Sequence, residues 1–328
     1  MTQEVPEGLK TVSCMVQKNY GEFTQYALYN PKLGYYAPKR ARVGFSEGTD
    51  FYTAVSLGPL FGFLVVSAVL DWLGGEQASQ LTWVEWGIEP DQPTLVDSWK
   101  AHARTVYEAE LPCPFASVQR LGLQDPFEIP AKALVFSNEL FDAQPFHRFR
   151  YQQGRWGELG VVETPSGWEP VVLPSLSGPG AELLRRLPLC MPEGYTLDYS
   201  FAAAALLRHL VDLPWEGGFI TFDYGKSWAA LLEGDPLGTA RAYRSHQMNS
   251  QLWEQPGTQD LTCHVCWDDL VAVLEEGGFE AIHLKSQESF LVTHGQQAIQ
   301  ACLQGSPQTY AAGAGARFGT ESLYGAPS

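Results

Sequence analysis

Residues 132–142 read KALVFSNELFD, a short apolar run that gives way at once to polar and acidic side chains. A run of this length and composition predicts a strand that is buried on both faces. Two further runs of the same kind are LTWVEW at 81–86 and GGFITFDYG at 217–225, and stretches with helical spacing lie between the runs. Buried strands that alternate with helices indicate an α/β fold with a doubly wound, mostly parallel sheet.

The polar residues that follow the central run are candidates for a functional site. Ligands of doubly wound sheets bind outside the carboxyl ends of the strands, and Asn138, Glu139 and Asp142 stand at that place. Two carboxylates and an amide could bind an amine, orient a guanidinium group or accept a proton. The simpler alternative is a helix N-cap at Asn138 with Glu139 in the first turn. The residues alone leave both interpretations open.

Two more candidates follow other apolar runs. Glu85 and Gly87 come after the run at 81–86, and a nucleotide-type cofactor needs glycine there because a side chain would block close approach to the backbone. An ordinary turn would explain a single glycine equally well. RTVYEA at 104–109 predicts the next strand, with Glu108 or Glu110 placed at its end to accept hydrogen bonds from a ribose. A solvated loop acid is the alternative to that role.

A further group of polar residues lies late in the chain. Asp223 ends the run at 217–225, and Asp260, Thr262 and His264 recur at alternate positions. If that segment is extended, these three side chains share one face. A solvated edge strand is the simpler alternative. No metal site is predicted, because the lone CHVC motif has no second pair of ligands nearby and a zinc site needs about four.

The chain divides into three parts by pattern. Residues 1–80 carry helix signals around an aromatic, Gly-rich loop, including an apolar helix at 57–75, and are predicted to cover the core. The α/β core is expected over 81–293, with an inserted hairpin and helical subdomain at about 146–215 that would shape a substrate site. Residues 294–328 are rich in Gly, Ala and Ser and predict a loose edge element or a disordered tail.

Composition narrows the function classes. The 328 residues include 21 Lys and Arg against 37 Asp and Glu, a net charge of -16, which excludes nonspecific nucleic-acid binding because a phosphate backbone needs a basic surface. No apolar stretch reaches the roughly 20 residues of a membrane span, and no signal peptide is recognisable, so we expect a soluble cytoplasmic protein. The 6 scattered cysteines predict reduced thiols. The sequence predicts no particular oligomeric state.

Seven sequence motifs, which follow one another along the chain, resemble those of a known family: FTQYALYNPKLGYY, VGFSEGTDFYTA, LGPLFG, SNELFDAQPFHRF, FITFDYG, GTARAYRSH and PGTQDLTCHV. With them the chain resembles the methyltransferase family of the mitochondrial complex I assembly factor and its bacterial relatives. The resemblance implies a seven-stranded class I methyltransferase sheet with a helical N-terminal cover. It also implies S-adenosylmethionine as cofactor and an arginine of a protein partner as the methyl acceptor.

The same resemblance assigns roles to individual residues. It places a cofactor entrance at Gly44, Gly48, Asp50 and Thr53, the methionine end of the cofactor at Glu85 and Gly87, and the reacting amine beside Asn138, Glu139 and Asp142. His264 would help to remove the proton from the acceptor.

One departure from the family supports an alternative function. After Glu85 the family usually runs through several glycines, whereas this chain has Trp86, Ile88, Glu89 and Pro90. These side chains are expected to crowd the cofactor. The alternative is therefore a catalytically inactive methyltransferase fold that acts as a binding or assembly module. A phosphate-cradling glycine loop, which another nucleotide cofactor would require, is not visible.

Overall fold

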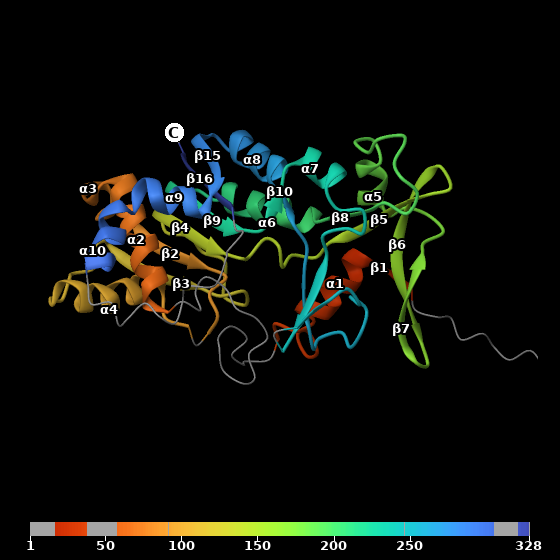
Figure 1. The fold of residues 1–328 in the computed structure, drawn as a ribbon, viewed down its shortest axis with the longest axis horizontal. Coiled ribbons are helices and arrows are strands. Elements are labelled where there is room, and N and C mark those ends of the chain that lie inside the picture. Colours follow the sequence, from red (N-terminus) through yellow and green to blue (C-terminus); the bar gives the residue numbers. More distant parts are fainter. Residues whose placement is uncertain (1–16, 38–57, 91, 246, 305–320, 328) are drawn as a thin grey trace, which may run out of the picture.

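The computed structural model describes residues 17–37, 58–90, 92–245, 247–304 and 321–327. The molecule is elongated, with a large α/β unit at one end and a smaller, mainly antiparallel β unit at the other (Figure 1). The large unit contains α2 Pro59–Leu73, α3 Gly75–Ala78, β2 Thr82–Trp86, α4 Leu95–Tyr107, β3 Ser117–Leu121, β4 Lys132–Asn138, α6 Phe201–Val211, β9 Glu216–Asp223, α8 Trp267–Glu276, β15 Phe279–Ser286, α9 Gln287–His294, α10 Gln296–Gln304 and β16 Glu321–Pro327.

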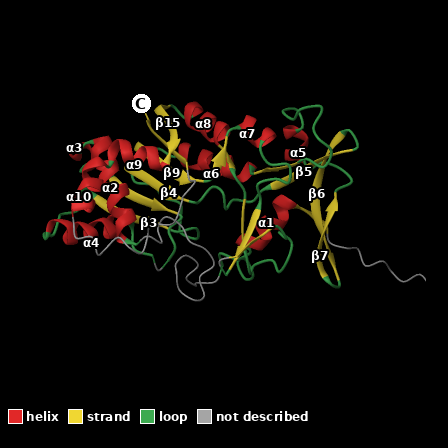
Figure 2. Cartoon of the chain, viewed as in Figure 1, coloured by secondary structure: helices red, strands yellow, loops and turns green. Residues whose placement is uncertain are grey.

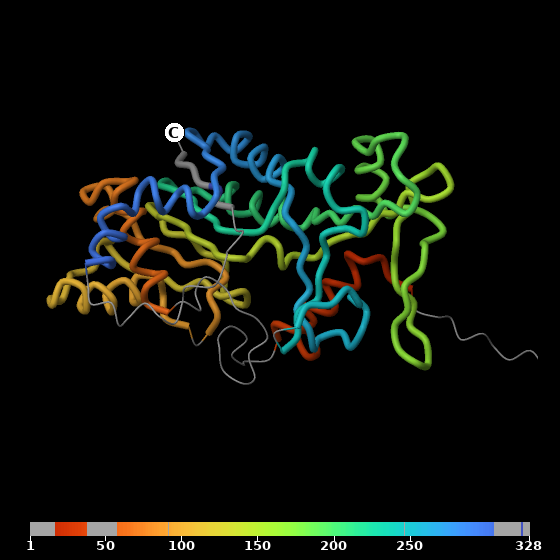
Figure 3. The backbone as a smooth tube through the Cα atoms, in the orientation of Figure 1, coloured from red at the N-terminus to blue at the C-terminus, as the bar shows by residue number. Residues whose placement is uncertain are grey.

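The smaller unit and the segments that join it to the large one contain the remaining elements. These are β1 Gln17–Asn19, α1 Tyr20–Tyr29, β5 His147–Gln152, β6 Arg155–Thr164, β7 Gly167–Val172, α5 Gly178–Leu183, β8 Thr196–Tyr199, β10 Gly225–Lys226, α7 Trp228–Glu233, β11 Arg241–Arg244, β12 Gln247–Asn249, β13 Asp260–Thr262 and β14 Val265–Cys266. The chain runs from one end of the molecule to the other more than once, after β4 and again after β9 (Figure 3).

The central sheet has the strand order β15-β16-β9-β4-β2-β3. Strands β3, β2, β4 and β9 run parallel to one another, and β16 is antiparallel to both β9 and β15. Helices cover both faces of this sheet (Figure 2). The predicted doubly wound fold is therefore confirmed. The described residues give this sheet 6 strands, one fewer than the resemblance implied.

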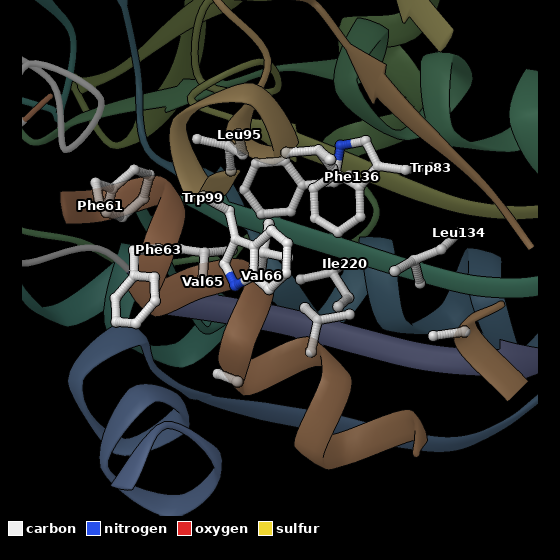
Figure 4. Packing of buried hydrophobic residues seen from close by; sticks show 14 of the residues in the cluster. Phe61, Phe63, Val65, Val66, Trp83, Leu95, Trp99, Leu134, Phe136 and Ile220 are labelled. Carbon is white, nitrogen blue, oxygen red and sulfur yellow. The ribbon is translucent and has the colours of Figure 1, made fainter. Parts of the chain in front are cut away.

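Alternating residues of the same strands build the two faces of the core. Trp83, Phe136 and Ile220 pack among the side chains of α2 and α4, and the rings of Trp83 and Phe136 stack with centroids 5.5 Å apart (Figure 4). The intervening residues Val84 and Val135 pack on the opposite face with α6 and α8. Because each such side chain contributes about 1.5–3 kcal/mol when fully buried, both helix layers are held on the strands by the apolar runs seen in the sequence.

The expected strand at 104–109 is wrong. Helix α4 continues through Tyr107, and Glu108 is its left-handed C-cap with φ 53°. Val106 packs against the core as part of this helix. The six residues of RTVYEA are too few to distinguish the spacing of apolar residues in a helix from that in a strand. The strand that pairs with β2 is instead β3, Ser117–Leu121.

The expected insertion at about 146–215 is correct for its hairpin and wrong for its helix. Strands β5 and β6 pair around Gln153 and Gly154, whose φ values of 54° and 73° fit a tight hairpin turn. Helix α6 packs on the central sheet, with Leu207 and Leu210 fully buried, so it belongs to the core.

The C-terminal segment contributes a strand inside the central sheet. Residues 321–327 form β16 between β9 and β15, and Leu323 is fully buried there. For these residues the expectation of a loose edge element or disordered tail is wrong. The division into a cover at 1–80, a core at 81–293 and a last part at 294–328 stays a proposal.

Candidate functional site

Two hollows meet beyond the carboxyl ends of β2, β4 and β9. The first, which we name the strand-end cleft, has a volume of about 740 Å³ and is lined by Tyr29, Tyr36, Glu85, Trp86, Gly87, Ile88, Glu89, Gln92, Pro93, Leu123, Phe136, Asn138, Glu139, Leu140 and Ala143. The second, the acidic pocket, has about 700 Å³ and is lined by Tyr36, Glu139, Asp142, Ala143, Tyr224, Thr239, Arg241, Tyr243, Asp260, Thr262 and His264.

Glu85 joins the strand-end cleft to the helix that follows β2. Its Oε2 accepts hydrogen bonds from the backbone N–H of Leu95 at 2.7 Å and from Nε1 of Trp83 at 3.2 Å. Burial raises the pKa of Glu85 to about 7, although these two hydrogen bonds oppose the shift. The carboxylate therefore holds the first turn of α4 in place while it lines the cleft.

Gly87 lets the backbone form the floor of the cleft. Its φ of 80° favours glycine, and a Cβ atom there would lie 2.9 Å from Cδ1 of Leu140. The neighbouring Trp86 is only 4% exposed and packs its ring against Phe127 and Phe141, with centroids 4.9 and 5.7 Å away. The indole of Trp86 therefore lies mostly in the core, although the residue also contributes to the lining of the cleft.

Arg120 holds the loop that lacks the family's glycines. Its guanidinium group donates to the carbonyl oxygens of Glu89 at 2.8 Å and Pro90 at 2.9 Å, and also to that of Gln92. A cation thus fixes the course of this loop. No sequence pattern singled out Arg120, since the strand that carries it was not predicted.

The strand-end cleft continues into a neighbouring hollow of about 950 Å³ past the end of β3. Asp125 lies there and accepts a hydrogen bond from the backbone N–H of Gly122 at 2.7 Å. Glu108 lines neither this hollow nor the strand-end cleft, so its expected place at a strand end is wrong. Asp125 is the carboxylate beside the strand that follows β2.

Asn138 and Glu139 end β4 without starting a helix, so the N-cap interpretation is wrong. Glu139 takes a left-handed φ of 50°, and its N–H donates to the Phe222 carbonyl oxygen at 2.8 Å. The Oδ1 atom of Asn138 is buried and accepts no hydrogen bond from the described residues. A buried acceptor costs free energy when it stays unpaired, so this oxygen at the cleft fits a ligand that donates a hydrogen bond.

Asp142, which lines the acidic pocket, lies close to the fully buried Asp223. Asp223 accepts hydrogen bonds from the N–H groups of Phe141 at 2.8 Å and Tyr224 at 2.8 Å, yet burial still raises its pKa to about 7. Burial raises the pKa of Asp142 well above its ordinary value, and repulsion from Asp223 and Glu139 adds to the effect. Such a cluster is relieved by a cation.

Asp260, Thr262 and His264 all line the acidic pocket, which agrees with the shared face that their alternating spacing implies for an extended segment. The Nδ1 atom of His264 is buried without a hydrogen-bond partner among the described residues. Burial lowers the pKa of His264 to about 4, helped by Lys226 and Arg241. The imidazole is therefore neutral near pH 7 and can accept a proton or a hydrogen bond.

Arg241 is a cation in the same pocket that sequence reasoning missed. Its guanidinium group donates to the carbonyl oxygens of Gly238 at 2.9 Å and Ala240 at 2.8 Å, and it pairs with Asp235 at 3.1 Å. These contacts tie Arg241 to the wall of the pocket. Its position depends on the turn before β11, which no local pattern revealed.

Four of the expected cofactor residues, Gly44, Gly48, Asp50 and Thr53, lie outside the described residues. Across the residues that the structure does describe, no group of three or more His, Cys, Asp or Glu side chains could hold a metal ion. In the same part of the chain, none of the helices combines the length and the apolar character that crossing a membrane requires.

A family model described as a putative S-adenosyl-L-methionine-dependent methyltransferase matches residues 114–284. A Drosophila melanogaster protein named as a mitochondrial homolog of the protein arginine methyltransferase NDUFAF7 is 27% identical over 74% of this chain and 63% of its own length. The Danio rerio protein of that name, also mitochondrial, is 24% identical over 84% of this chain and 72% of its own. The chain thus spans less than two thirds of the first of these relatives.

Two crystal structures from Burkholderia thailandensis share the fold. One, bound to S-adenosyl-homocysteine, aligns with a TM-score of 0.77 at 20% identity and covers 94% of this chain and 88% of the other. The second is a native structure with a TM-score of 0.73 at 21% identity, covering 94% and 87%. The expected methyltransferase fold is confirmed. The expected cytoplasmic location is contradicted, because both animal relatives are named as mitochondrial.

Proposed function

The chain belongs to the family of putative S-adenosyl-L-methionine-dependent methyltransferases, and we propose that it transfers a methyl group from S-adenosylmethionine to a guanidinium nitrogen of a protein arginine. The observation that carries this proposal is the junction of the two hollows. A cleft over the strand ends shares Tyr36, Glu139 and Ala143 with a pocket rich in carboxylates. A cofactor in one and a cationic acceptor in the other would meet at these residues.

The strand-end cleft suits the cofactor that the family uses. Gly87 leaves the backbone open to close approach, and Asn138 offers a buried acceptor without a partner. Glu85 adds a carboxylate within the same lining. When bound, S-adenosylmethionine supplies a methyl group on a positively charged sulfur. A wall of carboxylate and amide oxygens favours such a cationic group.

The acidic pocket suits a guanidinium group. Glu139, Asp142 and Asp260 line it, and a planar guanidinium can donate to several carboxylate oxygens at once. These contacts localise the positive charge on the nitrogens that donate and so restore nucleophilic character to another. As the carbon–nitrogen bond forms and the carbon–sulfur bond breaks, the acceptor nitrogen must lose a proton. The neutral imidazole of His264 lies in the pocket to accept it.

The names of the two animal relatives, both protein arginine methyltransferases, support arginine as the acceptor. The alternative function, an inactive fold kept for binding or assembly, draws on the loop of Ile88, Glu89 and Pro90, which lacks the usual glycines. Arg120 holds that loop by its carbonyl oxygens.

Substitution of Asp142 by Asn tests the proposed function. We expect Asp142→Asn to lower methyl transfer at least about 100-fold, because a charged group that stabilises the transition state is lost. The melting temperature should not fall, because a buried carboxylate repelled by its neighbours becomes neutral. The assay follows labelled methyl transfer from S-adenosylmethionine to a library of arginine-containing peptides.

The matched control is Asp212→Asn, which removes an exposed carboxylate at the end of α6 and should leave the rate unchanged. Equal activity of the Asp142→Asn protein and the wild type would contradict a catalytic role for the pocket. A folded wild type that labels none of the arginine peptides would contradict the arginine assignment.

A further inference from the structure

The segment YNPKLGYY at 29–36 stood out in the sequence, yet the mechanism above gives it no role. It forms a tight turn that closes α1. Oδ1 of Asn30 accepts hydrogen bonds from the N–H groups of Lys32 and Leu33, both at 3.0 Å. A Cβ atom on Gly34 would lie 2.5 Å from the backbone nitrogen of Asn30, so only glycine fits there. The shape of the turn is therefore fixed by its own side chains.

The turn returns the chain onto α1 and places Tyr36. The N–H groups of Tyr35 and Tyr36 donate to the carbonyl oxygens of Ala27 and Leu28, both at 2.9 Å. Among the described residues, Tyr36 alone lines the strand-end cleft, its continuation past β3 and the acidic pocket. Its side chain thus stands where the cofactor side and the acceptor side of the site meet.

Two contacts fix the side chain of Tyr36. Its ring stacks on that of Tyr29 with centroids 5.3 Å apart and planes 24° apart. Its hydroxyl group donates to Oδ1 of Asp260 at 3.0 Å. Burial keeps the pKa of Tyr36 well above its ordinary value, with repulsion from Asp260 as the next cause, so the hydroxyl stays protonated and able to donate.

The partners of Tyr36 are themselves held in place. The Tyr29 hydroxyl donates to the Ala143 carbonyl oxygen at 3.1 Å and accepts from Nε2 of Gln144 at 3.2 Å. Oδ1 of Asp260 also accepts from the N–H of Leu261 at 3.0 Å. The aromatic pair is thus a rigid wall beside carboxylates, and the face of an aromatic ring attracts cations.

We propose that Tyr36 sets the point of methyl transfer, its ring forming the wall between the strand-end cleft and the acidic pocket and its hydroxyl group orienting Asp260 for the cationic acceptor. This inference rests on the proposed function. In this inference the ring of Tyr36 contributes to binding of both the cofactor and the acceptor, whereas its hydroxyl group contributes to binding of the acceptor alone. Two substitutions therefore have different expected effects.

Tyr36→Phe keeps the ring and removes the hydroxyl. We expect it to weaken binding of an arginine probe about tenfold, because a hydrogen bond to a charged group is lost, and to change the affinity for S-adenosylhomocysteine less than twofold. Tyr36→Leu removes the ring as well and should weaken the binding of both ligands about tenfold. In methyl transfer, the Phe variant should raise KM for the peptide more than it lowers kcat.

The experiment measures the dissociation constant of S-adenosylhomocysteine by calorimetry and that of N-acetyl-arginine amide by NMR titration in its presence. N-acetyl-citrulline amide, which is uncharged and of similar shape, is the matched probe. Tyr26→Phe is the matched variant, since Tyr26 lies on α1, next to the turn that carries Tyr36, packs against Trp168 and lines none of these hollows. It should behave as the wild type.

Different results separate this inference from the proposed function. If the wild type prefers arginine to citrulline and both Tyr36 variants bind as the wild type does, the role of Tyr36 is overturned and the function stands. If the wild type binds S-adenosylhomocysteine and ignores arginine, the acceptor is wrong. In that case the role of the Tyr36 ring is tested by the affinity of Tyr36→Leu for S-adenosylhomocysteine. An affinity equal to that of the wild type overturns the role of the ring. A wild type that binds neither ligand contradicts both.

Discussion

At the scale of single residues, the site contains buried carboxyl groups, and burial disfavours their charged form. Glu85 is 7% exposed and accepts a hydrogen bond from the first turn of α4. Asp142 lines the acidic pocket, and the fully buried Asp223 lies close to it. Each has a pKa above its ordinary value because the charged form is poorly solvated. Charge that folding makes unfavourable can be stabilised by a bound cation.

The ionisation of Glu85 predicts a dependence of stability on pH. Because its folded pKa of about 7 exceeds the unfolded value, its contribution to stability is complete below about pH 4.5 and is lost as the pH rises through 7. Glu85→Gln, which cannot ionise, should therefore gain about 3 kcal/mol of unfolding free energy relative to the wild type between about pH 4.5 and pH 8.

Urea denaturation at both pH values measures this difference. The control is Glu275→Gln, a change of an exposed residue on α8, which should track the wild type at both. A difference between Glu85→Gln and the wild type that stays constant with pH would contradict the account of Glu85.

Sequence reasoning found the site residues that directly follow an identified strand. Asn138, Glu139 and Asp142 could be placed because a strand end fixes where the next side chains lie. Tyr36, Arg120 and others could not, since their positions depend on how a turn or a strand packs against distant parts of the chain. The local spacing of apolar residues in the sequence carries no information about such long-range contacts.

At the scale of elements, apolar runs predicted the buried strands better than the exposed ones. β4 and β9 are covered on both faces and were identified, whereas β3, Ser117–Leu121, has one fully buried residue, Leu121, and was missed. Ser117 and Arg120 of β3 are exposed, and Val118 and Gln119 are half-buried. An edge strand leaves a weaker pattern because one side of it meets solvent.

The position of β16 inside the central sheet predicts that the last part of the chain contributes to the free energy of unfolding. Leu323 is fully buried between the sheet and its helices, so Leu323→Ala should cost about 2–5 kcal/mol of unfolding free energy by leaving a cavity. Chemical denaturation measures the loss.

Leu189→Ala is the control for that change, since Leu189 is 95% exposed and its loss should alter stability by less than about 0.5 kcal/mol. If the two variants were equally stable, β16 would not be the strand between β9 and β15 in solution.

At the scale of the whole molecule, the net charge of -16 and the acidic pocket act in the same direction. A negative molecule attracts cationic ligands and concentrates them near its surface, which agrees with a basic acceptor. The elongated arrangement leaves the site between the large sheet and the segments that lead to the smaller unit (Figure 1). A protein substrate could therefore contact both.

The central claim is that the strand-end cleft binds the methyltransferase cofactor, and titration calorimetry with S-adenosylhomocysteine tests it most directly. The wild type should bind with micromolar affinity, about -8 kcal/mol. Gly87→Ala should weaken binding at least about tenfold, because the new Cβ meets Leu140 and a residue with a side chain resists a φ of 80°.

Gly154→Ala imposes a similar change at a hairpin turn with φ 73° and open space around it, and it should bind as the wild type does. Binding by the wild type that is weakened at Gly87 and unchanged at Gly154 is the predicted result. A folded wild type that shows no heat of binding, or equal affinity in all three proteins, would contradict the assignment of the cleft.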